Sequence, residues 1–390
     1  MKHIFLDNNS TTKISKDVLD EMNKYLTNYD GNPSSNNFLG IKSKEQIKIS
    51  RSKIAKLVNC DSKDIYFTSG ATESNNLAIK GVCELYRNQG NHIITFKTEH
   101  KAVLDTYKSL ESKGFKTTIL DVNQNGTINI SDLEESITSK TILCSLMHAN
   151  NEIGNIYPIK KVSEICKNKN IKFFVDGAQA VGKIHVDLID LDIDFYSFTG
   201  HKFYGPKGIG CLYIKNSRLK KQLTPQIIGG GQEFNYRSGT LNTASIIGFG
   251  KASEISHEKL KDEIKHIEFL RDKMITEFDK HLSGIHINGD MESRIPGNLN
   301  ISFLGVDNLW LLSQIHDKVS ISAGSACSSQ TIEPSHVLRA INKDDNISSS
   351  AIRICVGRNN SEREIDYFIN LVLDLVNEYR NKTNYTTGSL

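Results

Sequence analysis

The sequence predicts an α/β protein with a large domain, built on a mostly parallel, doubly wound sheet, and a smaller α+β domain. Short apolar runs that end at polar residues alternate with helical patterns over residues 65–214. A long amphipathic pattern with apolar residues three or four apart then covers Glu254 to Leu282, which is typical of a helix that bridges two domains. We expect residues 16–259 to form the large domain, and residues 1–15 with 260–390 to form the small one.

Each strand is predicted by a short apolar run, and each helix by apolar residues at helical spacing. In chain order the expected strands are 4–6, 65–68, 91–100, 116–120, 141–147, 171–176, 195–198, 208–214, 297–303 and 320–322. The expected helices are 43–57, 71–86, 101–112, 130–137, one that follows the glycine-rich loop of residues 227–240, 254–282 and 362–379. Ser361 and Glu364 form the capping box that predicts where the last helix begins.

The composition is that of an ordinary globular protein. The chain has 390 residues, of which 38% are hydrophobic and 24% charged, and its net charge is +3. Lysine and arginine are scattered, so we expect neither direct nucleic-acid binding nor association with a membrane. Seven widely spaced cysteines contain no CxxC pair, the first residues lack the apolar segment of a signal peptide, and no apolar run reaches eighteen residues. A reducing cytoplasm is the expected location.

An acid and an amine follow two neighbouring strands of the predicted sheet. Asp176 ends the apolar run of residues 171–175, and Lys202 follows the run of residues 195–198. Ligands bind at the carboxyl ends of the strands in open α/β sheets. Pyridoxal phosphate chemistry needs this pair, because a lysine binds the aldehyde while a carboxylate keeps the pyridine nitrogen protonated. A structural ion pair at a strand end is the alternative.

A further set of residues follows other strand ends. After the strand at 65–68, Ser69 and Gly70 break the pattern before a helix, so the free N–H groups of Gly70, Ala71 and Thr72 predict an anion-binding site. An ordinary helix cap is the alternative.

Two other strand ends also carry polar side chains. His100 lies at the end of the strand that begins near residue 91, where a structural histidine is the alternative. The segment HANNEIGN, after another strand, contains His148, Asn150, Asn151 and Asn155.

Two residues of the second domain also suggest chemistry. Cys327 lies in a run of Gly, Ala and Ser without bulky residues, which predicts an exposed loop and makes its thiol a candidate nucleophile. An incidental loop cysteine is the alternative. Arg353 lies between apolar residues in SAIRICVGR and therefore needs an anionic partner. A substrate carboxylate and an internal acid are equally compatible with the sequence.

With these motifs together, the sequence resembles the cysteine desulfurases of the IscS and NifS kind, in the class V aminotransferase group of fold-type I pyridoxal-phosphate enzymes. The resemblance covers nearly the whole chain and rests on motifs in family order. They include LDNNSTT, GNPSS, FTSGATESNNLAIKG, TEHKAVLD, MHANNEIG, VDGAQAVGK, SFTGHKFYGPKGIG, GGGQE, RSGT, GSACSS, EPSHVLRA and IRICVGR.

The resemblance implies a role for each matching residue. Lys202 is the lysine that binds the cofactor aldehyde, Asp176 faces the pyridine nitrogen, and His100 stacks on the ring. The remaining implied cofactor contacts are Ala71, Thr72, Asn151, Gln179, Thr199, His201 and, from the other subunit of a homodimer, Thr240. Asn155 and Arg353 match the residues that hold the substrate carboxylate. Cys327 matches the catalytic cysteine on a loop whose length resembles the long-loop group I enzymes.

The implied reaction converts L-cysteine to L-alanine and leaves the sulfur on Cys327 as a persulfide, with His100 or another base assisting deprotonation of the thiol. The implied partners are a second copy of the chain and an iron–sulfur scaffold protein or another sulfur acceptor. Cys327 meets metal only through a transient cluster shared with such a scaffold. Another class V enzyme, such as a small-amino-acid aminotransferase or a selenocysteine lyase, is the nearest rival, and a catalytically idle partner of a sulfur-transfer complex is a rival of another class.

Overall fold

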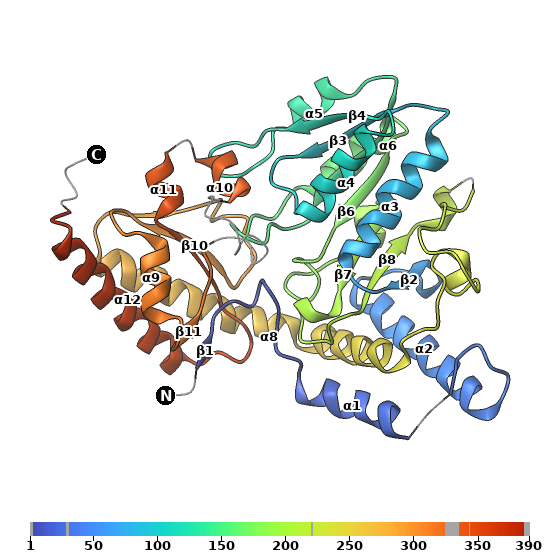
Figure 1. Ribbon diagram of the computed structural model, residues 1–390, viewed down its shortest axis with the longest axis horizontal. Coiled ribbons are helices and arrows are strands. Elements are labelled where there is room, and N and C mark those ends of the chain that lie inside the picture. The colour runs from blue at the N-terminus through green and yellow to red at the C-terminus, as the bar shows by residue number, and fades with distance from the viewer. Residues whose placement is uncertain (1–2, 29–30, 220, 324–334, 343, 386–390) are drawn as a thin grey trace.

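The computed structural model describes residues 3–28, 31–219, 221–323, 335–342 and 344–385, which form two domains joined by one long helix (Figure 1). The large domain contains the first helices and the central sheet. The small domain combines the N-terminal strand with the C-terminal third of the chain, so that both ends of the chain lie on the same side of the molecule.

The large domain is built around a seven-stranded sheet in the order β2-β8-β7-β6-β5-β3-β4. Its strands are β2 (Ile65–Thr68), β3 (His92–Phe96), β4 (Lys116–Leu120), β5 (Thr141–Met147), β6 (Lys172–Asp176), β7 (Phe195–Thr199) and β8 (Gly210–Ile214). From β7 to β4 all neighbours pair in parallel, whereas β8 runs antiparallel to β2 and β7. The mostly parallel sheet expected from the alternating pattern is confirmed.

Helices cover both faces of this sheet. They are α1 (Lys16–Thr27), α2 (Phe38–Leu57), α3 (Ala71–Tyr86), α4 (Lys101–Glu111), α5 (Ile130–Ser136), α6 (Ile159–Asn168) and α7 (Leu188–Leu191). Short 3-10 helices are Ser62–Asp64, Gly200–Lys202, Asn216–Arg218 and Glu233–Asn235. Phe174 of β6 packs with apolar residues of α3 and α4, while its neighbours Phe173 and Val175 pack in the cluster that contains α6. Because side chains alternate along a strand, both faces are buried, as a doubly wound sheet requires.

The small domain has its own core. Its strands are β1 (Ile4–Phe5), β9 (Ile285–Ile287), β10 (Asn298–Phe303), β11 (Val319–Ser320) and β12 (Ala351–Cys355). Its helices are α9 (Asn308–Ile315), α10 (His336–Ile341), α11 (Asp345–Ser349) and α12 (Glu362–Lys382). The three strands β12, β10 and β9 pair antiparallel, and β1 pairs in parallel with β11. The capping box of Ser361 and Glu364 begins α12 as expected.

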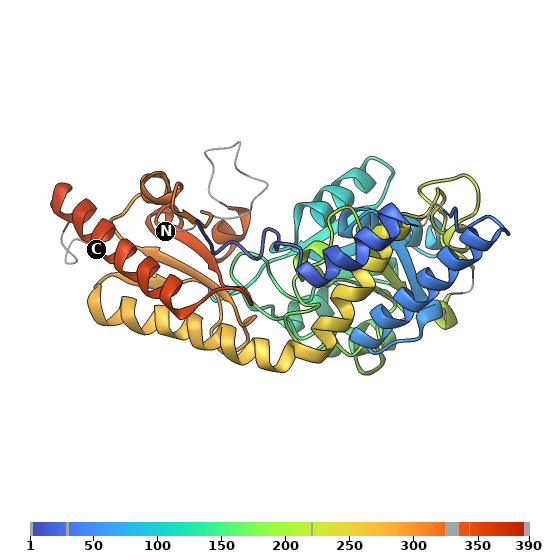
Figure 2. The same ribbon diagram turned by 90° about the horizontal axis from the view of Figure 1, so that it is seen from below.

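Helix α8 (Thr243–His281) links the two cores (Figure 2). Phe249 packs in the large-domain core, whereas Met274 and Phe278 pack in the small-domain core. The boundary near residue 260 stays a prediction. The helix expected after residue 240 and the one expected from residue 254 form a single helix, which begins at Thr243. Its first turns use small residues for close contact. A Cβ atom on Gly248, for example, would lie 2.5 Å from the Met22 sulfur.

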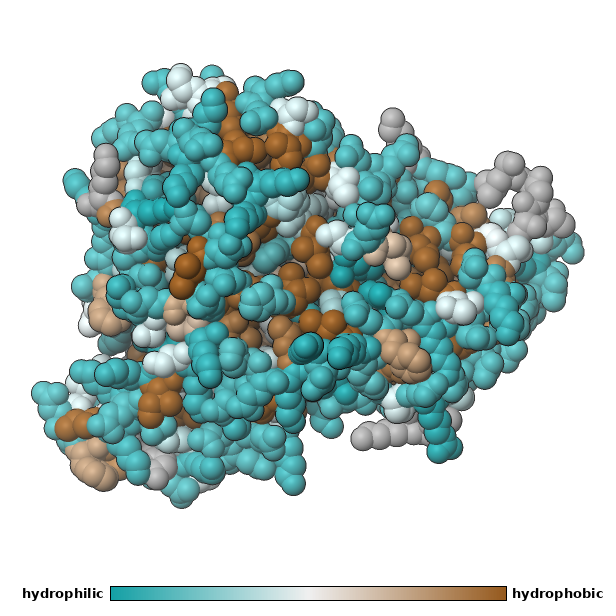
Figure 3. Space-filling view, turned by 180° about the vertical axis from the view of Figure 1, so that it is seen from behind, coloured by the Kyte–Doolittle hydropathy of each residue, from teal (hydrophilic) through white to brown (hydrophobic). Residues whose placement is uncertain are grey.

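The outer surface seen from behind is mainly hydrophilic, with separate hydrophobic patches over both domains (Figure 3). Within the described part of the chain, no helix has the length and apolar character needed to cross a bilayer.

The position of α8 generates a prediction about the small-domain core. Phe278→Ala should lower the free energy of unfolding by about 3–5 kcal/mol, because it removes a fully buried ring that contacts Phe303 and Phe368. Phe269→Ala is the matched control on the same helix, since that ring is 54% exposed and its loss should change stability by about 0.5 kcal/mol or less. Denaturant unfolding of both variants measures the difference; equal effects would contradict the assignment of Phe278 to the core.

Candidate active site

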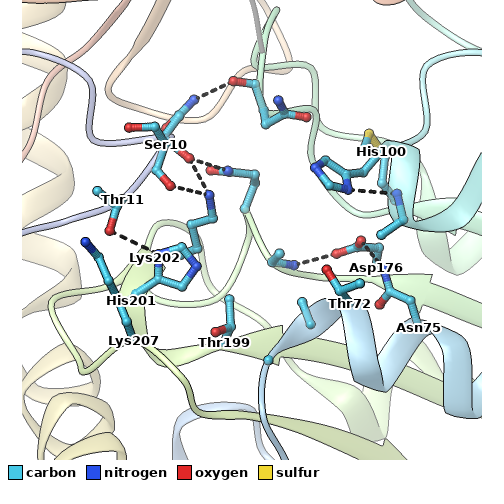
Figure 4. A pocket seen from close by; sticks show the side chains of 18 of the residues that line it. Ser10, Thr11, Thr72, Asn75, His100, Asp176, Thr199, His201, Lys202 and Lys207 are labelled. Carbon is cyan, nitrogen blue, oxygen red and sulfur yellow. Dashed lines mark hydrogen bonds between the residues drawn. The ribbon is translucent and has the colours of Figure 1, made fainter. Parts of the chain in front are cut away.

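A cavity of about 580 Å³ opens at the carboxyl edge of the central sheet. It is bounded by the ends of β6 and β7, the N-termini of α3 and α4, the segment of residues 9–11, and Arg353 of β12. Figure 4 shows Lys202 and Thr11 on one side of this cavity and Asp176, Asn75 and His100 on the other. The acid and the amine expected at one edge therefore do lie at one site.

Asp176 is buried and held in one orientation. One of its carboxylate oxygens, Oδ2, accepts a hydrogen bond from Asn75 Nδ2 at 2.7 Å, and Oδ1 accepts from the backbone N–H of Ala178 at 3.0 Å. The Asn75 amide is fixed in turn, because its Oδ1 accepts from the hydroxyl of Ser197 at 2.6 Å. A carboxylate fixed in this way can face a cationic ring nitrogen without rearrangement.

The Lys202 side chain extends from the 3-10 turn that follows β7. Its Nζ donates to the carbonyl oxygens of Asn9 at 2.8 Å and Ser10 at 2.7 Å. Both acceptors belong to the N-terminal segment that follows β1. The amine therefore lies in the cavity wall at the junction of the two domains.

A second lysine lies behind the first. Lys183 borders a separate cavity of about 30 Å³, which Lys202 also lines, and it is not among the residues that line the larger cavity. Its Nζ donates to Asn9 Oδ1 at 2.7 Å and also to Gln179 Oε1. Burial, followed by the positive charge of Lys202, lowers the pKa of Lys183 to about 7.

The N-terminus of α3 meets the requirements of an anion-binding site. Gly70 is its N-cap, and among the described residues no side chain caps this end. A Cβ atom added at Gly70 would have no atom within 4 Å, so the space before the helix is open. Ala71 and Thr72 follow Gly70 along the cavity wall, and Lys207 also lines it. Backbone N–H groups, the helix dipole and a nearby amine together favour a dianionic group.

Thr199 and His201 lie at the end of β7, beside the same anion-binding site. The Thr199 hydroxyl donates to the carbonyl of Ile209 at 2.8 Å, and Nδ1 of His201 lies 3.1 Å from the hydroxyl of Thr11. Burial, followed by the charges of Lys202 and Lys207, lowers the pKa of His201 to about 4. The ring is therefore neutral at neutral pH and can donate one N–H to an anion.

His100 is the N-cap of α4, and this determines its tautomer. Its Nδ1 accepts a hydrogen bond from the backbone N–H of Ala102 at 3.1 Å. Burial is the main cause that lowers the pKa of His100, so the ring is neutral at neutral pH and its proton is assigned to Nε2. In this state the ring presents a donor, not the base that the sequence suggested for the cysteine thiol.

Arg353 has an internal partner and still lines the cavity. Its Nη2 lies 2.7 Å from Asp7 Oδ1, and its Nη1 donates to the carbonyl of Asn151 at 3.2 Å. Its Nε is buried without a hydrogen-bond partner among the described residues. The sequence left open whether Arg353 pairs with an internal acid or with a substrate carboxylate. The two are compatible, because Asp7 holds the guanidinium at the cavity.

The expectation for Asn155 needs correction. Its Nδ2 donates to the carbonyl of Asn125 at 2.8 Å and its Oδ1 accepts from the N–H of Asp290 at 3.0 Å. Both ends of the amide are thus occupied by loop backbone, and Asn155 does not line the cavity. Asn151, four residues earlier, does line it.

Cys327 lies outside the described residues, but the two flanks of its segment are described. On one side, Ser322 exchanges two backbone hydrogen bonds with Arg353, at 3.2 and 2.6 Å. On the other, Ser335 donates to the Glu152 carboxylate, and His336 Nε2 lies 2.9 Å from the carbonyl of Glu99, the residue before His100. The segment therefore leaves and re-enters the described structure beside the cavity.

Thr240 is exposed and does not line the cavity of its own chain. It follows Arg237, which forms an ion pair with Glu73 of α3 at 2.9 Å. No cluster of three His, Cys, Asp or Glu side chains suited to a metal occurs in the part of the chain that the structure describes.

Sequence reasoning missed several residues of the site, namely Asn9, Ser10, Thr11, Asn75 and Lys183. Asn75 could have been predicted, because it lies one helical turn after Ala71 and therefore on the same face of α3 as the predicted anion-binding site. The N-terminal residues lie in the motif LDNNSTT, but no sequence pattern places them beside Lys202, which is more than 190 positions away.

Comparison with known proteins identifies the family. The model of the aminotransferase class-V family matches residues 4–368. The chain belongs to this family. It is 47% identical over 381 residues to a cysteine desulfurase IscS of Buchnera aphidicola subsp. Baizongia pistaciae, covering 97% of this chain and 94% of that protein. It is 45% identical over 377 residues to a cysteine desulfurase IscS of Ehrlichia chaffeensis, covering 97% and 92%.

Solved structures agree with this assignment. A NifS-like protein superposes with a TM-score of 0.89 and 37% identity, covering 96% of this chain and 99% of that one. The protein SspA, solved in complex with cysteine, superposes with a TM-score of 0.80 and 33% identity, covering 92% and 100%. The α/β fold expected from the family resemblance is confirmed.

The expected cofactor is confirmed by the family, whose members are pyridoxal-phosphate enzymes. The residues present fit this group, because the cavity combines an uncapped helix N-terminus, a lysine amine and a fixed carboxylate. A phosphate, an aldehyde and a pyridine nitrogen need these three partners.

The capping role of His100 generates a prediction. At pH 7 the protein should carry the proton of this ring on Nε2, which NMR of selectively ¹⁵N-labelled histidine distinguishes from a proton on Nδ1. Ala102→Pro is the control, since it removes the donor N–H at a first-turn position that accepts proline. The control should populate both tautomers. A protonated Nδ1 in the unaltered protein would show that the capping bond is absent.

Proposed function

We propose that the protein is a pyridoxal-phosphate-dependent cysteine desulfurase, which converts L-cysteine to L-alanine and transfers the sulfur to Cys327 as a persulfide. The observation that carries the proposal is the meeting of Lys202, Asp176 and the open N-terminus of α3 around one cavity. The names and coverage of the relatives support the choice of substrate.

The cofactor would be held at three places in the cavity. Lys202 is proposed to bind the aldehyde, Asp176 the pyridine nitrogen, and Gln179 the ring hydroxyl. His100, with its proton on Nε2, would lie against the ring. The proposed phosphate and remaining cofactor contacts are Ala71, Thr72, Asn151, Thr199, His201 and, from a second chain, Thr240.

The substrate carboxylate would meet Arg353. This guanidinium is oriented by Asp7 and Asn151, and its Nε has no partner among the described residues. We propose Asn151 in place of Asn155 as the accompanying amide, because only Asn151 lines the cavity.

Pyridoxal phosphate, when bound, accepts the electron pair released at the substrate α-carbon and so weakens the carbon–sulfur bond. The chain's own groups then move protons and sulfur. The Lys202 amine takes the α-proton. The Cys327 thiolate takes the sulfur atom and becomes a persulfide, while the substrate carbon gains a proton and leaves as alanine. The sulfur is oxidised by two electrons and the carbon is reduced by two, so no outside oxidant is needed.

The flanks of the Cys327 segment favour this reaction over transamination. One flank is bonded to Arg353, which would hold the substrate carboxylate, and the other lies beside His100. Both described flanks therefore lie beside the place proposed for the substrate, whereas a class V aminotransferase needs no thiol in the segment between them.

The proposed partners are L-cysteine, a second copy of the chain, and an iron–sulfur scaffold protein or another sulfur acceptor. A homodimer is supported by the exposure of Thr240 and of apolar side chains on the same domain, among them Phe38 (76%), Ile228 (84%) and Phe234 (67%). With a scaffold, Cys327 would meet a cluster metal only transiently.

A cytoplasmic location is proposed from the cysteines. Among the described residues Cys60, Cys83, Cys144, Cys166, Cys211 and Cys355 are free thiols. The neighbouring Cys166 thiol, followed by burial, raises the pKa of Cys144, and neither cysteine is in a disulfide. A reducing compartment maintains this state.

The role of Lys202 can be tested by trapping. Borohydride treatment of the pyridoxal-phosphate-loaded protein should attach a pyridoxyl group to Lys202, because Lys202 lines the larger cavity whereas Lys183 lies behind it. Peptide mapping by mass spectrometry locates the group, and Lys202→Ala should carry none. A pyridoxyl group on Lys183 or Lys207 would disprove the assignment.

The role of Cys327 is tested by substitution. Cys327→Ser should keep the visible spectrum of the bound cofactor, while alanine and sulfide formation from L-cysteine falls by a factor of about 100 or more. Cys60→Ser is the matched control, because this thiol is half-buried and burial raises its pKa. It should react at the rate of the unaltered protein. Undiminished alanine and sulfide formation by Cys327→Ser would place the nucleophile elsewhere.

A further inference from the structure

Lys183 is a buried amine that the proposed reaction does not use. It follows Gly182, whose φ of +74° turns the chain so that Lys183 returns onto Gln179, four positions earlier. A side chain at position 182 would also collide with Phe203, since a Cβ atom there would lie 2.5 Å from the Phe203 Cβ. The sequence QAVGK thus places the amine directly behind the glutamine.

Two side-chain amides turn their oxygens toward this amine. Gln179 Oε1 and Asn9 Oδ1 both accept from Lys183 Nζ. The nitrogen ends of the amides consequently point elsewhere. Gln179 Nε2 donates to the carbonyl of Asn9 at 2.8 Å, and Asn9 Nδ2 donates to the carbonyl of Asn151 at 3.1 Å.

We propose that Lys183 is a positioning residue of the active site, which holds the Gln179 amide with its nitrogen toward the cofactor. The inference rests on the proposed function of the cavity. Gln179 lines the cavity, and its Nε2 carries a second N–H beyond the one given to Asn9. That N–H suits an oxygen acceptor such as the cofactor's ring hydroxylate.

A side-chain amide needs such positioning because its donor and acceptor ends have nearly the same shape. An amide can rotate by half a turn and exchange its donor and acceptor ends at little cost unless its surroundings distinguish them. Lys183 distinguishes them, because an amine placed behind both amides offers donors to their oxygens. It can donate both bonds with or without its third proton. Burial and the charge of Lys202 lower the pKa of Lys183 to about 7, and the orientation does not depend on which form is present.

A double-mutant cycle tests whether Lys183 acts through Gln179. The four proteins are the unaltered chain, Lys183→Met, Gln179→Ala and the double variant, each loaded with pyridoxal phosphate. Cofactor affinity is measured by equilibrium dialysis, and the visible absorption spectrum is recorded for each. We expect Lys183→Met to weaken cofactor binding about tenfold and to shift absorption away from the band of the ring hydroxylate. The double variant should bind the cofactor no more weakly than Gln179→Ala alone.

Two further variants control the cycle. Lys183→Gln retains a donor of similar length and should recover part of the affinity. Lys172→Met removes another largely buried amine, bonded to Asp194 at 3.2 Å at the opposite end of β6, and should leave affinity and spectrum unchanged. If Lys183→Met does not fold, the same cycle is run with Lys183→Gln.

The outcomes separate the two proposals. Additive losses in the double variant, or a Lys183→Met protein with unchanged affinity and spectrum, would overturn the role of Lys183 while borohydride still traps the cofactor on Lys202. Failure to trap the cofactor on Lys202 in the unaltered protein would overturn the proposed function itself.

Discussion

The site depends on the hydrogen bonds that the Asn9 carbonyl accepts from Lys202 and Gln179. Asn9 belongs to a segment that leaves the small domain at β1 and crosses to the large domain. Thr12, three residues later, donates its backbone N–H to the carbonyl of His201 at 2.8 Å. The ends of β6 and β7 are therefore held against a chain segment from the other domain. Because α8 joins the same two domains, their relative position fixes where the Lys202 amine lies.

The charges of the cavity favour an anionic ligand. Lys202, Lys207 and Arg353 line it, and Arg353 is only partly balanced by Asp7. Burial, followed by the nearby charge of Asp176, raises the pKa of Glu99 well above its ordinary value. Positive groups in the cavity wall favour a phosphate and a carboxylate, which the cofactor and an amino-acid substrate supply.

Local sequence patterns predicted most of the fold and part of the active site. Strands such as β6, where the apolar residues 173–175 end at Asp176, were predictable, and so was the position of Asp176 and Lys202 at one sheet edge. That the helix after residue 240 continues unbroken into the one expected from residue 254 was not predictable, because Gly248 and neighbouring small residues hide the apolar period. Nor could hydropathy show which asparagine of HANNEIGN faces the cavity: Asn151 and Asn155 differ only in the backbone groups that distant loops bring to them. Asn9 was missed for the same reason, since its partners depend on how two domains pack.

The most direct measurement is the product balance of the purified, cofactor-loaded protein with L-cysteine and a thiol reductant. Alanine, sulfide, pyruvate and ammonia are quantified in one time course. A cysteine desulfurase should release alanine and sulfide in equal amounts, with neither pyruvate nor ammonia. Pyruvate and ammonia formed together with sulfide would instead show elimination at the β-carbon, and 3-mercaptopyruvate formed in place of alanine, measured in the same time course, would show transamination. Either result would contradict transfer of the substrate sulfur to Cys327.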